Sequence, residues 1–366
     1  MYLGNFRTWK NIHIGAILFV LTIPLLSGQD LSAQHEQFRR EVEKILKNEV
    51  HVDFNIVPSF IVFVQDRHQF TYVDTFGQAM PGGNPDPWFW EIGSLSKPVV
   101  AYLAERALYT LGLSAETSMC SIMPDSLCHG GWSKVTVRQV IEHQAGLPWI
   151  TNQMALKEND VNDPYATYNL ESLISDVQQA NPVPGKFAFS HLGYAAFYWL
   201  FERVGGLNSF ADTELFSHHH GGFVTEVPDS MIVTGYGLNG KGTSPWHANA
   251  LMSALGLKSD IYSMYEFMEL VSIQLPREEY VMSHALKKEL AMHDKMKTYK
   301  VVQGWFVFRS GKSLVFFHTG HTGGHYVSAA FIPEDDQYAI VFSNGVAGTQ
   351  GLVLSVLGML QRAKKR

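Results

Sequence analysis

Residues 91–98 read Glu91-Ile92-Gly93-Ser94-Leu95-Ser96-Lys97-Pro98, and a strong helical pattern begins within them. The apolar stripe of that pattern consists of Val99, Leu103, Ala107 and Leu111. It predicts a helix over 96–111 that ends at Gly112. Ser94 and Lys97 stand three positions apart at the start of this helix, a spacing that puts two side chains on one helical face.

The Ser94 and Lys97 spacing suits nucleophilic catalysis. A serine hydroxyl is a weak nucleophile that needs a nearby base and a group that stabilises an oxyanion. Unpaired N–H groups at a helix start serve the oxyanion, and burial beside another cation would lower the pKa of Lys97 until its amine accepts a proton. The tetrapeptide alone is weak evidence, because a serine N-cap followed by a surface lysine has the same spacing.

The composition is that of a globular protein, with 366 residues, 46% of them apolar and 17% charged, and a formal net charge of −6. Length alone would permit two domains. Basic residues form no long stretch, so we expect no nucleic-acid partner. Cys120 and Cys128 could close a local loop in an oxidising compartment, or they could be two buried or free thiols.

The N-terminal residues differ from the rest of the chain. Arg7 and Lys10 precede an apolar run over 14–26, which is shorter than the ~20 residues that a spanning helix needs. We therefore expect residues 1–34 to be a signal peptide, or an uncleaved N-terminal anchor that attaches the protein to a membrane. The protein is expected to be exported to the periplasm or the cell exterior, with residues 35–366 as its folded domain.

The remaining pattern predicts strands near both ends of the chain and helices between them. Apolar periodicity and turn residues give a helix over 35–49, a hairpin over 57–76, helices over 96–111, 136–143, 191–203 and 260–275, strands over 301–309, 313–318, 326–332 and 338–343, and a last helix over 352–361. This order predicts an α+β fold, with an antiparallel sheet flanked by helices plus an all-helical lobe. A crevice between the two parts is the expected place for a site.

Five segments in order carry a family resemblance. Residues 91–98 resemble the nucleophile segment of class C β-lactamases and of related penicillin-binding-protein-like and esterase-like serine hydrolases. The others are Val135–Pro148, Pro184–Tyr194, Gly256–Asp260, and Phe317–Gly320 with the strand ending at Asn344. The resemblance implies a β-lactamase/transpeptidase-like fold and an acyl-enzyme reaction on an ester, amide or lactam. It implies a small-molecule or peptide substrate, and no metal or cofactor.

The resemblance also assigns roles to single residues. Ser94 would be the acylated nucleophile and Lys97 its activating partner. The edge formed by Thr319 and Gly320 would line the cleft, and the N–H groups of Ser94 and His321 would form the oxyanion hole. His318 stands where the family's Lys-Thr-Gly motif has lysine. The fixed positive charge that would pair with a substrate carboxylate is then absent, which favours neutral ester or amide substrates.

The second family motif is altered. Phe189-Ser190-His191 stands where the family has Tyr-x-Asn, so the phenol that shares proton transfer with the lysine is missing. Three hypotheses follow: Lys97 is the only base, His191 has taken over as a base, or the protein is a catalytically impaired binding or sensing protein. His191 could also simply cap the next helix, and Tyr194 is expected in the core.

Other histidines and aromatic residues admit two interpretations each. His318, His321 and His325 could suggest metal-dependent hydrolysis, but strand alternation points neighbouring side chains apart, and we predict no metal site. The run 218–220 is expected in a solvated loop. The aromatic segment 88–90 is either an apolar wall for an acyl group or a buried strand. Trp149, Tyr165 and Tyr168 fall where the family has its substrate loops.

Overall fold

The computed structural model describes residues 28–50, 54, 58–67, 70–78, 88–157, 163–215, 221–274, 288–292, 295–345 and 349–363. The chain divides into two units, Met1–Arg40 and Glu41–Arg366, and helix α1 (Gly28–Ile45) crosses the boundary between them. In the described residues, no helix combines the length and the apolar character that crossing a membrane requires. Most of the predicted export segment and the histidines at 218–220 lie outside the described residues.

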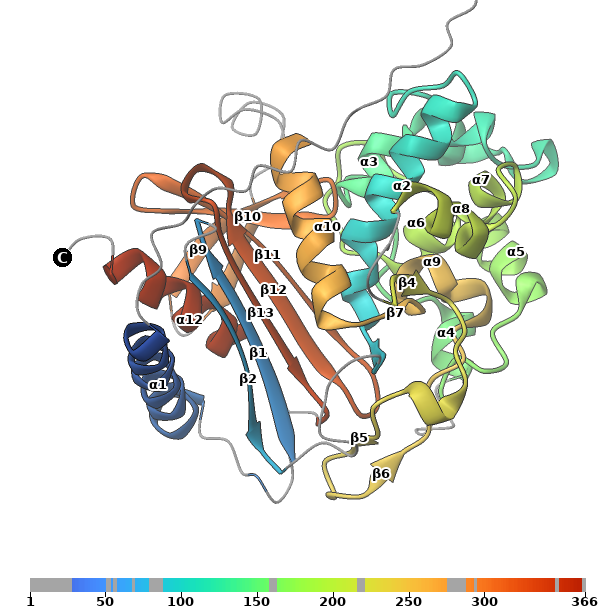
Figure 1. Cartoon of the computed structure of the whole chain (residues 1–366). Coiled ribbons are helices and arrows are strands. Elements are labelled where there is room, and N and C mark those ends of the chain that lie inside the picture. The colour runs from blue at the N-terminus through green and yellow to red at the C-terminus, as the bar shows by residue number, and fades with distance from the viewer. Residues whose placement is uncertain are drawn as a thin grey trace, which may run out of the picture. The chain divides into compact units, whose positions relative to one another are not determined.

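An eight-stranded antiparallel sheet forms the centre of the second unit (Figure 1). Its order is β2 (Phe70–Gly77), β1 (Ser59–Asp66), β13 (Gln337–Ser343), β12 (Tyr326–Ile332), β11 (Ser313–His321), β10 (Trp305–Ser310), β9 (Lys295–Val302) and β8 (Lys288–Met292). The predicted hairpin pairs with the last strand, with Val62 opposite Val341. The predicted α+β class with one sheet built from both ends of the chain is confirmed.

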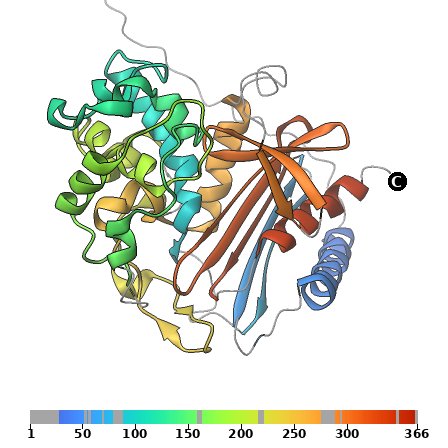
Figure 2. The same cartoon turned by 180° about the vertical axis from the view of Figure 1, so that it is seen from behind.

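Two helices cover opposite faces of this sheet. The hydroxyl of Tyr338 in β13 lies 2.8 Å from Ser272 Oγ in α10 (Ile261–Gln274). The hydroxyl of Ser328 in β12 lies 2.6 Å from Thr349 Oγ1, directly before α12 (Gln350–Ala363). Because successive side chains of a strand alternate between faces, Ser328 and Tyr338 belong to different faces, and so do α12 and α10 (Figure 2).

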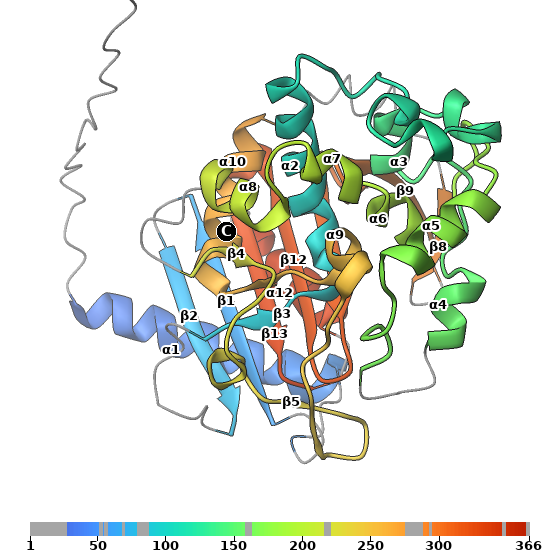
Figure 3. The same cartoon turned by 90° about the vertical axis from the view of Figure 1, so that its right-hand side faces the viewer.

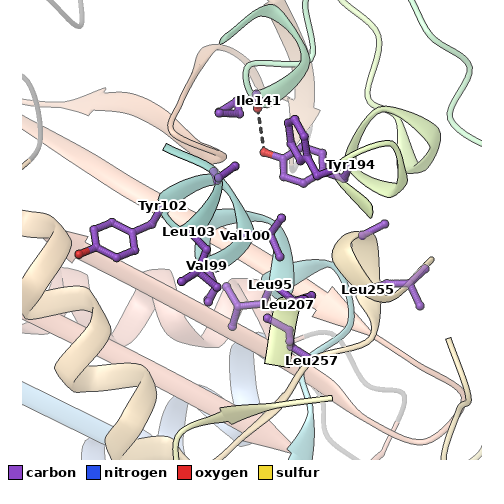
Figure 4. Packing of buried hydrophobic residues seen from close by; sticks show 14 of the residues in the cluster. Leu95, Val99, Val100, Tyr102, Leu103, Ile141, Tyr194, Leu207, Leu255 and Leu257 are labelled. Carbon is purple, nitrogen blue, oxygen red and sulfur yellow. Dashed lines mark hydrogen bonds between the residues drawn. The ribbon is translucent and has the colours of Figure 1, made fainter. Parts of the chain in front are cut away.

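The remaining helices gather around the long helix α2, beside the sheet (Figure 3). They are α2 (Ser96–Thr110), α3 (Val137–Ile141), α4 (Asn152–Lys157), α5 (Leu170–Gln179), α6 (His191–Ala195), α7 (Tyr198–Glu202), α8 (Leu207–Glu214) and α9 (Met252–Leu255). Figure 4 shows Leu95, Val99 and Leu103 in the apolar packing around α2. The Tyr194 hydroxyl donates to the Ile141 carbonyl at 2.8 Å, which places Tyr194 in this core as expected.

Short strands join the helical part to the nucleophile segment. β3 (Trp90–Glu91) and β4 (Phe223–Val224) flank β7 (Lys258–Ser259), and β5 (Gly235–Tyr236) pairs with β6 (Gly242–Thr243). Trp90 is buried against the rings of Phe342 and His325. Of the two alternatives for the segment 88–90, the structure supports the buried strand and not an apolar wall for an acyl group.

Two predicted elements are each split in the structure. The strand predicted over 301–309 is β9 and β10, separated by a turn at Gln303 and Gly304, which have φ of 47° and 79°. The helix predicted over 191–203 is α6 followed by α7. Apolar residues on both sides of each break keep the sequence pattern continuous, so periodicity alone does not reveal either break.

The structure confirms one predicted helix start and decides between the two alternatives for the cysteines. Thr136 caps α3 and forms a capping box with Gln139, as the predicted helix start requires. Of the two alternatives for the cysteines, the structure has the Cys120–Cys128 disulfide, which closes a short loop between residues eight positions apart.

Two glycines allow β11 to lie directly against the 3₁₀ turn η2 (Gly93–Leu95). A Cβ on Gly320 would stand 1.9 Å from the Ile92 carbonyl oxygen. Gly93 has φ of +48°, and a Cβ there would stand 2.5 Å from the His321 carbonyl oxygen. Backbone contacts this close exclude any side chain, so the position of the nucleophile relative to β11 depends on both glycines.

We predict that Gly320→Ala lowers the free energy of unfolding by about 1–3 kcal/mol or more, because the added methyl group must displace either β11 or η2. Urea titration measures the loss. Gly358→Ala within α12 is the matched control, since the new Cβ would meet only Arg362 at 3.7 Å. If the two variants were equally stable, the close contact between β11 and η2 would not be a constraint on the fold.

Candidate active site

Ser94 and Lys97 meet at the junction of η2 and α2. The Lys97 Nζ donates to Ser94 Oγ at 3.0 Å. Ser94 is half-buried and lines a cavity of about 800 Å³, whereas Lys97 has no exposed surface. The helical i, i+3 spacing that the sequence indicated therefore brings the hydroxyl and the amine into contact.

The surroundings of Lys97 favour an uncharged amine. Its Nζ also donates to the Ala254 carbonyl at 2.8 Å and lies 3.0 Å from His191 Nδ1. In the described part of the chain, no carboxylate forms an ion pair with it. Burial lowers the pKa of Lys97 well below its usual value, so the amine can be unprotonated and accept a proton.

The His191 side chain contacts Lys97 and does not cap the N-terminus of α6. Ser190 is the residue that caps α6, since its hydroxyl accepts from Gly193 N–H at 3.1 Å, so the proposed capping role of His191 is wrong. The His191 Nε2 accepts from the indole N–H of Trp149 at 3.0 Å. Burial and then the nearby Lys97 lower the pKa of His191 well below its usual value, which keeps the imidazole neutral.

Phe189 occupies the place where the family motif led us to expect a tyrosine. Its ring centroid lies 4.9 Å from Lys97 Nζ and its ring stacks on Phe306 at 6.2 Å. A phenyl ring at that distance has no atom that could exchange a proton with Ser94. Phe189 therefore takes no part in a proton relay, and Lys97 is the proton-exchanging group that contacts Ser94 Oγ.

His318 lies buried in β11 beside the same cavity. Its Nδ1 donates to the Thr319 carbonyl at 2.7 Å, and its buried Nε2 has no hydrogen-bond partner among the described residues. Burial, with a contribution from Lys97, lowers the pKa of His318 to about 3. The imidazole is neutral near pH 7, and its Nε2 is a bare acceptor.

The end of β11 runs beside Ser94. β10 pairs with β11 only as far as Phe306 opposite Phe317, so no described strand covers the β10 side of Thr319, Gly320 and His321. The Cβ position of Gly93 is 2.7 Å from the His321 nitrogen, which puts the two expected oxyanion donors, the N–H groups of Ser94 and His321, on neighbouring backbone segments.

The cavity lining is aromatic and uncharged. No Lys, Arg, Asp or Glu of the described residues contributes to it. Its aromatic residues are Trp149, Tyr165, Phe187, Phe189, Trp246, Phe306 and Tyr326. Trp149 and Tyr165 thus line the cavity as expected of the substrate loops, whereas Tyr168 is buried and donates its hydroxyl to Asp176 at 2.6 Å.

A polar network that sequence reasoning missed fixes the turn after β11. The buried Glu91 carboxylate accepts from Trp246 N–H at 2.5 Å, from Thr322 Oγ1 at 3.0 Å and from His325 Nδ1 at 3.0 Å. Burial opposes ionisation of Glu91, but His325 and the other donors outweigh it and lower the pKa of Glu91. Glu91 is the first residue of the nucleophile segment, and an acidic residue between the apolar Trp90 and Ile92 was the available sequence signal.

The three histidines near the end of β11 do not converge. His318 bonds to Thr319 and His325 to Glu91 and Val233, while the His321 ring stacks on Tyr326. The part of the chain that the structure describes holds no group of three metal-ligating side chains.

Comparison with known proteins identifies the family. Residues 88–355 match the β-lactamase family model, and the chain belongs to this family of serine hydrolases. No curated protein matches the sequence.

Solved structures agree with the fold. A class C β-lactamase from Rhodobacter sphaeroides is 16% identical, with a TM-score of 0.68 over 90% of this chain and 99% of that one. A β-lactamase from Sulfitobacter sp. EE-36 is 15% identical, with a TM-score of 0.70 over 91% and 99%. A tyrosine-to-phenylalanine mutant of a class C β-lactamase is 16% identical, with a TM-score of 0.69 over 90% and 98%. At these identities the likeness establishes the β-lactamase/transpeptidase-like fold.

The buried amine predicts a pH dependence of stability. Between its lowered native pKa and the usual value of 10.5, Lys97 binds a proton in the unfolded chain and none in the native one, so stability rises with pH. We expect Lys97→Met to remove up to about 1.4 kcal/mol per pH unit of this rise. Urea unfolding at pH 7 and pH 9 measures it, and Lys134→Met at an exposed site is the control. Parallel pH dependences in wild type and Lys97→Met would contradict a neutral native Lys97.

Proposed function

We propose that this protein is a serine hydrolase that forms an acyl-enzyme on Ser94 and hydrolyses an uncharged ester or amide. The observation that carries the proposal is the 3.0 Å contact between Ser94 Oγ and the buried amine of Lys97, at the wall of an aromatic cavity. Membership of the β-lactamase family supports the reaction type.

The geometry supports a two-step reaction. Ser94 Oγ attacks the substrate carbonyl carbon while its proton moves to Lys97 Nζ, and the carbonyl oxygen becomes an oxyanion beside the N–H groups of Ser94 and His321. The oxyanion collapses, the leaving group departs with the proton from Lys97, and the acyl group stays on Ser94. Each oxyanion donor would contribute roughly 10²–10³-fold in rate. Water then attacks the acyl carbon on Ser94 and gives a proton to Lys97, which returns it to Ser94 Oγ as the carboxylic acid product leaves.

Phe189 favours one second candidate, a binding or sensing protein that is acylated without rapid release. Deacylation needs a base for the attacking water, and Phe189 supplies none. In that case Lys97 activates Ser94, but the acyl-enzyme persists. The two candidates share the nucleophile and differ only in the second step.

Covalent labelling tests the nucleophile and separates the two candidates. We expect a fluorophosphonate probe to label wild type and not Ser94→Ala, because Ser94 is the serine that lies against the buried amine among the described residues. Ser96→Ala is the control, since its buried hydroxyl accepts from Leu257 N–H at 3.2 Å and does not line the cavity. Intact-mass spectra taken over time with a p-nitrophenyl ester distinguish turnover from a stable acyl-enzyme. Labelling of Ser94→Ala at the wild-type rate would refute the assignment.

The preference for uncharged substrates follows from His318 and the lining. The neutral His318 Nε2 has a lone pair and no N–H, so it cannot donate a hydrogen bond to a substrate carboxylate. The uncharged aromatic walls provide no counter-charge for that carboxylate. Burying an unpaired carboxylate in such a cavity is costly.

Changing the charge at position 318 tests this preference. We predict that His318→Lys raises kcat/KM for an ester with a terminal carboxylate relative to its uncharged analogue by roughly tenfold or more, the scale of one charged hydrogen bond. His318→Gln, which alters the side chain without adding charge, is the matched control. A wild type that already prefers the carboxylate ester would show that His318 does not select neutral substrates.

A further inference from the structure

Three side chains from distant parts of the sequence form a chain of hydrogen bonds ending at Ser94. Trp149 lies between α3 and α4, its side chain is 59% exposed, and its indole N–H reaches His191 Nε2 at 3.0 Å. On the other side of the imidazole, His191 Nδ1 lies 3.0 Å from Lys97 Nζ. The backbone N–H of His191 also donates to the Trp149 carbonyl at 3.2 Å, which holds the two residues together.

The indole determines which nitrogen of His191 carries the proton. An indole N–H can only donate, so the Nε2 that receives it must be an unprotonated acceptor. A neutral imidazole has one N–H, and the proton of His191 is therefore on Nδ1. That Nδ1–H points at Lys97 Nζ, so Lys97 is the acceptor in this hydrogen bond.

Only an uncharged Lys97 can accept the hydrogen bond from His191 Nδ1–H. A neutral amine has one lone pair for His191 and two N–H groups, which match the Ala254 carbonyl and Ser94 Oγ. A lysinium has three N–H groups and no lone pair, so its third N–H would face the Nδ1–H of His191. The hydrogen bond from Trp149 and a protonated Lys97 are thus mutually exclusive.

We propose that Trp149 is a positioning residue which, by fixing the tautomer of His191, holds Lys97 as a free amine in the resting site. The proposal deepens the proposed function, because only a free amine can take the proton of Ser94. For that step Lys97 must exchange its hydrogen bond from His191 Nδ1–H for one from the Ser94 hydroxyl, since a neutral amine has one lone pair. The protonation states themselves do not depend on turnover.

The other titratable groups around Lys97 and His191 do not determine the protonation state of Lys97. His143 comes from the segment after α3, Tyr194 from α6, and His318 and His321 from β11. None of them is a carboxylate that would stabilise a lysinium, and burial raises the pKa of Tyr194 well above its usual value, so the phenol stays neutral. The low pKa of the buried Lys97 agrees with the same state.

Proton uptake by Lys97 should therefore open the contact to Trp149. When Nζ gains a proton, His191 must lose the proton on Nδ1 and take one from water on Nε2, which leaves the imidazole neutral overall. The Nε2–H then faces the indole N–H, and the exposed Trp149 side chain must move away. Removing the indole N–H removes this obstacle and makes Lys97 easier to protonate.

NMR of the full chain with ¹⁵N-histidine and ¹³C-lysine labels tests the proposal with Trp149→Phe. In wild type we expect the His191 ¹⁵N shifts of an Nδ1–H tautomer. In Trp149→Phe we expect a shift toward Nε2–H and a titration midpoint of Lys97 raised by roughly half to one pH unit, the shift that corresponds to one net hydrogen bond. An Nε2–H tautomer in wild type, or an unchanged or lowered midpoint in Trp149→Phe, would overturn the proposal.

Two controls isolate the hydrogen bond from general effects of the substitution. Trp246→Phe removes another indole that lines the cavity, but its Nε1 has no hydrogen-bond partner among the described residues, so the Lys97 midpoint should not move. In a His191→Ala background, Trp149→Phe should produce no shift, because the connecting imidazole is gone. A shift of equal size in that background would also overturn the proposal.

The readouts separate this inference from the proposed function. If Ser94 is not labelled but the titrations behave as expected, the hydrolase assignment is wrong and the role of Trp149 stands. If Ser94 is labelled and Lys97 titrates alike in wild type and Trp149→Phe, the proposed role of Trp149 is wrong and the hydrolase assignment stands. In an active enzyme, the acid limb of the acylation rate should move to higher pH in Trp149→Phe, as the raised midpoint requires.

Discussion

The burial of one amine, that of Lys97, is the constraint on which the site depends. Water is removed from Nζ and no described carboxylate replaces it, so the charged form is penalised and the free base becomes available. The surrounding structure provides that burial from several directions: α9 supplies the Ala254 carbonyl, α6 supplies His191, and the ring of Phe189 covers the amine. If water reached this lysine, the sequence motif would be unchanged, but the amine would stay protonated and could not act as a base.

The position of the nucleophile relative to β11 is set by backbone contact and by a buried hydrogen-bond network behind it. Gly93 and Gly320 let the turn and the strand approach without intervening side chains. Glu91, the last residue of β3, accepts hydrogen bonds from Thr322 and His325, which follow β11. These contacts have no chemistry of their own in the proposed reaction. They keep the donors of the expected oxyanion hole beside Ser94, where a displacement of about 1 Å could cost 10²-fold in rate.

The replacement of a tyrosine by Phe189 shifts proton control to other side chains. A phenol could exchange protons directly, whereas the neutral His191, fixed between Trp149 and Lys97, acts through its tautomer. The imidazole is 3.0 Å from the amine and has no hydrogen bond to Ser94, which supports Lys97 as the base and His191 as its partner. The same cavity is aromatic and uncharged, so the proposed substrate preference and the proposed protonation state of Lys97 both rest on the absence of fixed charge among the described lining residues.

The sequence determined those features that depend on local geometry. Helical spacing paired Ser94 with Lys97, alternating apolar residues indicated the antiparallel strands, and the altered motif at Phe189 was visible without a structure. Only the tertiary structure decided that Trp149, His191 and Lys97 form one chain of hydrogen bonds, and that the strand over 301–309 breaks at Gln303. The physical reason is that side-chain spacing within a helix or strand is fixed by its backbone, whereas contacts between distant segments depend on how the whole core packs.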